Sequence, residues 1–205
     1  MNATEFDARE TQPSKAITNA ESHQLFLNEL ADIYDGEKQL IKFLPRMAKA
    51  AQSPELREAF EDHFLETLNH VILIEATARS LDEPLASKTF TAMQSLLQEA
   101  LQLMENEKDF SALDAVLIAA ARKVEQYEIA TYGRLLAWAD QMGLEEVAGL
   151  LDEIFCDEKR ADERLAQLDN TLSRNEKLQQ PNFDSITLKY ESHSLIRSLN
   201  APLES

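Results

Sequence analysis

Glycine and proline are scarce in this chain, and their scarcity constrains the fold more than any other feature of the sequence. Only 4 of the 205 residues are glycine and 6 are proline. Sandwiches and barrels need many tight turns, which depend on these two residue types. The long stretches between the few turn-forming positions consist of helix-favouring residues. We therefore predict an all-α fold built from a few long helices.

The breaks divide the chain into two helical hairpins joined by a long connection. Ser53-Pro54 separates the first two helices, because serine is a good N-cap and proline is well placed in a first turn. Gly143 separates the last two. We predict long helices at about 22–51, 54–80, 111–142 and 144–172, and a crossover helix at about 88–106. This is a four-helix bundle over residues 21–174, with a flexible arm at 1–20 and a tail at 175–205.

Each long helix carries an apolar seam with steps of three and four residues, and each seam contains one glutamate. These are Glu37, Glu66, Glu128 and Glu158. Antiparallel neighbours at equal distance from their shared turn lie at the same height, and Glu128 and Glu158 are equally far from Gly143. Four carboxylates are therefore expected to meet at one level in the middle of the core.

Four ionised carboxylates in a dry core would repel one another, and their desolvation would cost several kcal/mol. Without compensation, most of them would therefore have to be protonated. Bound divalent metal removes this cost, whereas a hydrogen-bonded network without metal is the alternative. Other ligand types share the same helix faces. They are His63 and His70 around Glu66, Glu125 before Glu128, and Asp162 after Glu158.

The roles of these flanking residues stay open from spacing alone. His63 and His70 are not both expected on the metal, and either is compatible with a hydrogen-bonded core position; we favour His70. Glu125 is either a ligand or a solvated flank. We expect Glu66 and Glu158 to bridge two metal ions, with Glu37 and Glu128 as terminal ligands.

The charge and composition exclude several classes of function. Acidic residues number 37 against 20 basic ones, a net charge of −17, so nucleic acid is not an expected partner. Apolar runs stay short of the roughly 20 residues that span a bilayer, and residues 1–20 lack the pattern of a signal peptide. With Cys156 as its single cysteine, the chain is expected to be a soluble cytoplasmic protein without membrane partners.

Four segments resemble the YciE/YciF family of ferritin-like proteins. They are LADIYDGEKQL, HFLET, ALIAAARKVEQYEIATYG and DEKRADERL, and the likeness covers about residues 22–174. The resemblance implies a ferritin-like four-helix bundle, usually dimeric and associated with bacterial stress responses. It also implies a di-iron site, with two iron ions per chain, whose carboxylates are Glu37, Glu66, Glu125, Glu128, Glu158 and Asp162.

The chain departs from the related rubrerythrin pattern at two positions. A Glu-x-x-His motif would need histidine at 69 and 161, where this chain has Asn69 and Ala161. Histidine is therefore reduced or displaced to His63 or His70. A site made mainly of carboxylates also suits manganese, a harder ion.

Two functions fit these expectations. The leading hypothesis is a bacterial di-metal protein that reacts with oxygen or peroxide in stress defence. The alternative is a non-enzymatic stress or assembly protein in which the metal is only structural. Apolar residues outside the inner seams predict a homodimer that uses the first two helices. These residues are Leu25, Ile41, Phe60, Ile72 and Ile74.

Overall fold

The computed structural model describes residues 19–107 and 110–179, which form helices with no strand among them. The helices are α1 (Asn19–Ala50), α2 (Pro54–Ser80), α3 (Thr91–Asn106), α4 (Phe110–Met142) and α5 (Glu145–Gln179). The all-α prediction is confirmed, and the four long helices begin and end within a few residues of the expected positions, apart from the end of α5.

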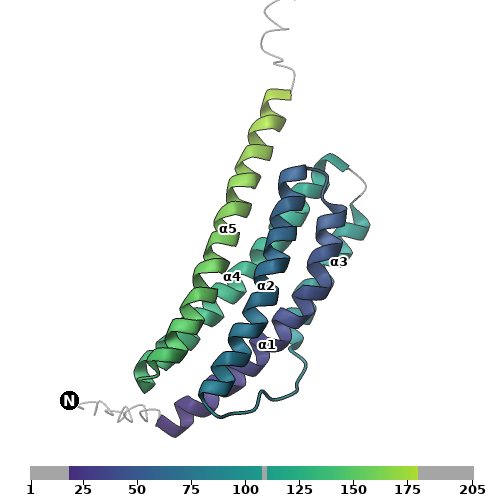
Figure 1. The fold of residues 1–205 in the computed structure, drawn as a ribbon. Coiled ribbons are helices and arrows are strands. Elements are labelled where there is room, and N and C mark those ends of the chain that lie inside the picture. Colours follow the sequence, from purple (N-terminus) through teal and green to yellow (C-terminus); the bar gives the residue numbers. More distant parts are fainter. Residues whose placement is uncertain (1–18, 108–109, 180–205) are drawn as a thin grey trace, which may run out of the picture.

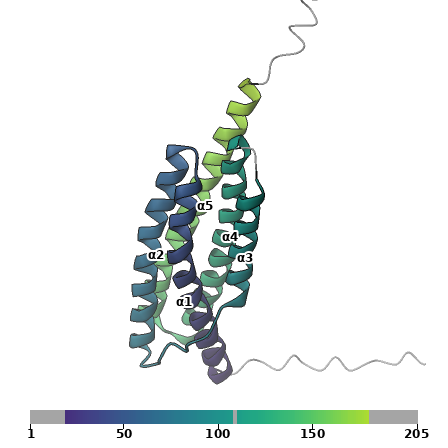
Figure 2. The ribbon, with the colours of Figure 1, turned by 90° about the vertical axis from the view of Figure 1, so that its right-hand side faces the viewer.

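The four long helices form the predicted four-helix bundle of two antiparallel hairpins, α1–α2 and α4–α5 (Figure 1). The short helix α3 lies on the crossover between the hairpins and packs on α4 and α1 (Figure 2). Helix α5 continues to Gln179, into the segment expected to be a tail, and projects beyond the other helices. Most of the expected arm and tail lies outside the described residues.

The turn between α1 and α2 is held by its own cap and by the second hairpin. The Ser53 hydroxyl accepts a hydrogen bond from the Leu56 backbone N–H at 3.3 Å, as the sequence predicted for an N-cap. The Asp114 carboxylate on α4 accepts two more, from the backbone N–H groups of Gln52 and Ser53, each at 2.7 Å. One buried carboxylate thus joins the two hairpins at this end of the bundle.

The turn between α4 and α5 depends on Gly143, whose φ of +70° is a left-handed conformation that favours glycine. The Gly143 and Leu144 N–H groups donate to the carbonyl groups of Asp140 and Ala139 at 3.1 and 3.0 Å. These bonds satisfy the end of α4 and reverse the chain within a few residues.

The core consists of two apolar clusters with a polar layer between them. One cluster takes Leu40 to Ala48 of α1, Ala51 just after it, and Leu113 to Val124 of α4, together with residues of α2, α3 and α5. The other takes Phe26 to Ile33 of α1 and Tyr132 to Ala139 of α4, together with residues of α2 and α5. Apart from Asp114, the buried charged residues lie on the stretch of each long helix that separates the two clusters. Apolar packing therefore closes this polar layer at both ends.

Within the described residues, no helix is at once long enough and apolar enough to cross a membrane.

Candidate metal centre

The polar layer brings six buried side chains together in two overlapping groups. The first group contains His63, Glu125, Glu128 and Glu158, and the second contains Glu37, His70 and Glu158. In each group, one potential ligand atom per residue lies within 4.8 Å of every other. All four long helices contribute, α1 and α2 from one hairpin and α4 and α5 from the other.

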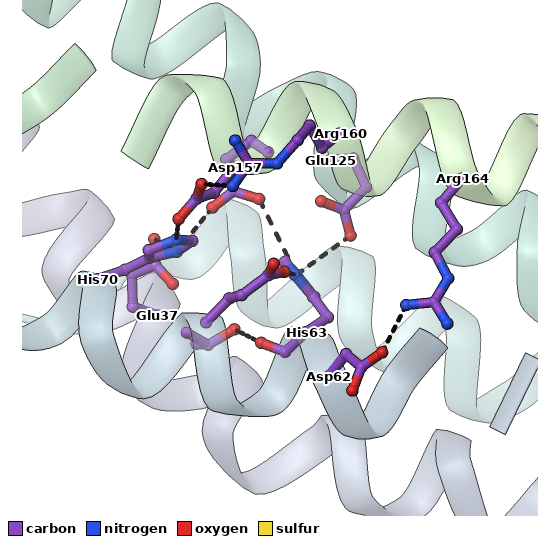
Figure 3. Close-up of polar contacts among 11 residues, drawn as sticks. Glu37, Asp62, His63, His70, Glu125, Asp157, Arg160 and Arg164 are labelled. Carbon is purple, nitrogen blue, oxygen red and sulfur yellow. Dashed lines mark hydrogen bonds and ion pairs between the residues drawn. The ribbon is translucent and has the colours of Figure 1, made fainter. Parts of the chain in front are cut away.

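Glu158 lies at the centre of this arrangement because its carboxylate belongs to both groups. Its Oε1 is 3.0 Å from Nδ1 of His70, and its Oε2 is 3.9 Å from Nε2 of His63. His63 Nε2 also lies 3.3 Å from Glu125 Oε1, and His70 Nδ1 lies 3.6 Å from Glu37 Oε1. Figure 3 shows Glu37 beside His70 on one side and Glu125 with His63 on the other.

Helix α2 directs two histidines inward where the sequence analysis favoured one histidine and Glu66. Its buried line runs through His63, Thr67 and His70, and the Thr67 hydroxyl donates to the His63 carbonyl at 2.7 Å. Glu66 lies one position off this line, and its side chain is 38% exposed. It therefore joins neither group, although its Oε2 is 3.5 Å from His63 Nδ1.

Asp162 also lies outside both groups. Arg122 on α4 donates to its two carboxylate oxygens, from Nε at 2.7 Å and from a terminal nitrogen at 3.3 Å. Asp162 comes four residues after Glu158 and lies on the same general side of α5. Its carboxylate, however, faces the Arg122 guanidinium on α4. The described geometry makes Asp162 one half of an ion pair between α4 and α5.

Two further residues outside the predicted ligand set contact the groups. The Tyr132 hydroxyl is buried and donates a hydrogen bond to Glu37 Oε1. Asp157 Oδ2 lies 3.4 Å from Nε2 of His70, on the opposite side of the ring from Glu37 and Glu158, and Asp157 is paired with Arg160. Proximity in sequence to Glu128 and Glu158 was the available signal, but only tertiary packing shows which neighbour points inward.

Burial and mutual repulsion shift the titration of the carboxyl groups in this layer. Desolvation, followed by the charges of nearby glutamates, raises the pKa of Glu128 well above its ordinary range. Desolvation does the same to Glu125, although the charge of His63 opposes it, and it also raises the pKa of Glu37. Glu158 differs: burial would raise its pKa, but His70 and His63 together lower it.

The pKa values of the two histidines are raised, whereas burial usually lowers the pKa of an imidazole. Burial alone would lower their pKa values, but Glu125, Glu66 and Glu158 raise the pKa of His63 to about 10. Glu158 and Glu37 likewise raise the pKa of His70 to about 11. Without metal, side chains of the polar layer therefore hold protons, and they must lose these protons before they can bind a metal ion.

The hydrogen-bonding of the layer is incomplete, and this tests whether a metal fits. Among the described residues, each of the six group members has a buried side-chain oxygen or nitrogen atom that makes no hydrogen bond. Both carboxylate oxygens of Glu128 and of Glu158 are in this state. Unpaired buried polar atoms cost about 1–3 kcal/mol each, so a convergent set calls for a further partner. Four carboxylates and two imidazoles suit iron or manganese.

Comparisons with known proteins agree with this fold. Protein YciF of Escherichia coli (strain K12) is 38% identical over 146 residues, which are 70% of this chain and 87% of YciF. The crystal structure of this stress protein has a TM-score of 0.73 and 35% identity, covering 75% of this chain and 97% of the other. The structure of YcfI from Rhodopseudomonas palustris has a TM-score of 0.70 and 31% identity, covering 76% and 98%.

A family match spans nearly all of the described helices. The family described as "Domain of unknown function (DUF892)" matches residues 21–177, a range that includes all six members of the two groups. Together with the YciF relationship, this match identifies the chain as a member of the YciF family of ferritin-like helical bundles.

Proposed function

We propose that this protein holds two metal ions in the polar layer and reacts with dioxygen or peroxide in a cytoplasmic stress response. The observation that supports the proposal is the convergence of six buried ligand-type side chains whose polar atoms lack hydrogen bonds. His63, Glu125, Glu128 and Glu158 would hold one ion, and Glu37, His70 and Glu158 the other. Glu158 would bridge them.

Two iron ions, when bound, would supply one reducing equivalent each to the oxidant, and manganese is the second metal that this donor set accepts. The surrounding residues have definable tasks. Asp157, 3.4 Å from His70 Nε2, can accept the N–H of that ring and so orient Nδ1 toward the centre. Tyr132 holds one oxygen of Glu37 and leaves Oε2 free of hydrogen bonds.

Iron loading tests this function. We expect protein loaded anaerobically with ferrous iron to bind two ions per chain and then to consume peroxide or dioxygen, with a change in the near-ultraviolet absorption. Elemental analysis and an oxygen electrode measure the two results, and Glu153→Gln on the surface of α5 is a control that should behave like the parent. Metal bound only at the surface in an anomalous map would overturn the proposal.

A structural role for the metal is the second candidate, favoured by the origin of the ligands. Each group joins residues from both hairpins, so a bound ion would cross-link the bundle whether or not it reacts. An ion with this role alone would raise the melting temperature but leave peroxide intact. Measuring both quantities on the same iron-loaded sample separates the candidates.

We also propose that the protein is a homodimer that uses an apolar stripe on α2. Phe60 and Ile74, expected on the outside, are buried in the bundle. The stripe consists instead of Leu65, Leu68 and Ile72, which are 62%, 38% and 57% exposed. These residues recur at helical spacing on one face, a pattern typical of a surface that a partner covers.

Light scattering tests the dimer. We expect a mass of twice 23.2 kDa at micromolar concentration, and a monomer when Leu65 and Ile72 are both replaced by glutamate. Those charges would be desolvated at the interface but not in the monomer, so dissociation without loss of helical circular dichroism is the expected result. A parent protein that runs as a monomer would contradict the proposal.

A further inference from the structure

A pocket of about 210 Å³ leads from the surface to one side of the candidate metal centre. It lies between α2 and α5, and its lining includes Ala59 and Ala161 as well as the side chains of His63, Glu66 and Glu125. His63 and Glu125 are buried and belong to the first group, while Glu66 is half-exposed. Neither Glu37 nor His70, the residues particular to the second group, lines this pocket.

We propose that this pocket is the passage by which divalent cations reach the centre, and that Glu66 is the residue that binds them first. This inference rests on the proposed function, because it needs a centre that holds metal. It gives a role to the one seam glutamate that joins neither group.

The charges around the mouth of the pocket favour a cation. Arg164 on α5 is already paired with two acids of α2, Asp62 at 2.7 Å, as Figure 3 shows, and Glu58 at 3.5 Å. Arg160 is likewise paired with Asp157. Because both arginines are already compensated by acids, the half-exposed carboxylate of Glu66, which pairs with no arginine among the described residues, makes the mouth of the pocket attractive to cations.

Glu66 connects solvent with the buried ligands. Its side chain is 38% exposed, yet Oε2 is 3.5 Å from Nδ1 of His63. Both ring nitrogens of His63 and Oε2 of Glu125 are buried without hydrogen bonds at the inner end of the pocket. A hydrated ion can therefore exchange some of its water for Glu66 before it meets these unpartnered atoms, which lowers the cost of dehydrating it in one step.

Stopped-flow uptake of Co²⁺, followed by visible absorption, tests the passage. We expect Glu66→Gln to take up Co²⁺ at least about tenfold more slowly than the parent, because the attracting charge is lost. Release into excess chelator should slow by a similar factor, and the amount bound at saturation should stay at two ions per chain. The matched control, Glu153→Gln, removes the same charge from an exposed position that does not line the pocket.

A second variant tests the pocket itself. Ala161→Phe should fill the passage and slow both uptake and release without removing any charge. Wild-type rates in both variants would overturn the inference, and so would a Glu66→Gln protein that releases Co²⁺ faster and binds it more weakly, since that result marks a permanent ligand. A parent protein that binds no Co²⁺ in the core would instead refute the proposed function.

Discussion

Replacing Glu158 by alanine is expected to weaken the binding of both metal ions at once. The Glu158 carboxylate belongs to both groups, whereas each of the other five residues belongs to one. Loss of a shared ligand weakens both positions, and removing even a residue that only orients a ligand typically costs about 10–100-fold in affinity. We therefore expect more than about 100-fold weaker binding at each position, measured by calorimetry and elemental analysis.

Alanine at His70 is the matched comparison, because His70 belongs to the second group only. This variant should keep one ion per chain, held by His63, Glu125, Glu128 and Glu158. If Glu158→Ala also kept one tightly bound ion, the two groups would not share a bridging carboxylate, and the arrangement proposed for the centre would be wrong.

The metal-free protein is expected to lose stability steadily as the pH rises from 5 to 9. The folded-state pKa values of Glu125 and Glu128 lie well above the ordinary 4.5, so above pH 4.5 unfolding releases protons that the fold retains. His63 and His70, with pKa values of about 10 and 11, add a second loss that begins above pH 6.5. Glu158, whose pKa is lowered, loses its stabilising effect only below 4.5 and does not oppose the trend.

The substitution Glu128→Gln isolates the contribution of one carboxyl group to this trend. Unlike most substitutions in a protein core, it is expected to increase the stability of the metal-free protein. It should do so at pH 7, because burial holds the pKa of Glu128 well above its value in the unfolded chain and glutamine removes the resulting cost at that pH. Both Glu128 oxygens lack hydrogen bonds, so the amide breaks none. The same substitution should weaken metal binding.

Thermal melts in chelator at pH 5, 7 and 9 provide the measurement. The surface variant Glu153→Gln corrects for the general effect of removing one charge from a protein with a net charge of −17. A Glu128→Gln protein that melts lower than the parent at pH 7 would show that the carboxyl group is stabilising where it lies, and would contradict a destabilised carboxylate cluster.

The helices and their order could be predicted because local signals and packing agree. Ser53-Pro54 and Gly143 mark turns by their own chemistry, and the apolar seams between them continue for many turns. Glu37, Glu128 and Glu158, taken from those seams, are all buried at the polar layer. Long periodic segments carry enough repeated information to outweigh any single ambiguous position.

Which side chains enter the polar layer depends on small rotations of each helix about its axis, and the spacing of apolar residues does not define these rotations. Helix α2 allows seams through Glu66 or through Thr67, and packing buries Thr67. Asp162 satisfies the spacing from Glu158, yet Arg122, far away in sequence, pairs with it. Tyr132 was one of several tyrosines near the seams, and only the tertiary arrangement brings its hydroxyl to Glu37. Spacing places a residue on a face, but its partners come from other helices.

The contact between Asp114 and the first turn has a consequence for the order of events during synthesis. The N–H groups of Gln52 and Ser53 need this carboxylate, which the ribosome adds about 60 residues later. Until α4 has emerged, the nascent α1–α2 hairpin also holds His63 and His70 without the acids of α4 and α5 that surround them in the bundle. We therefore expect α1 and α2 to pack only loosely against each other on the ribosome. Their turn should become ordered when the α4–α5 hairpin packs against them.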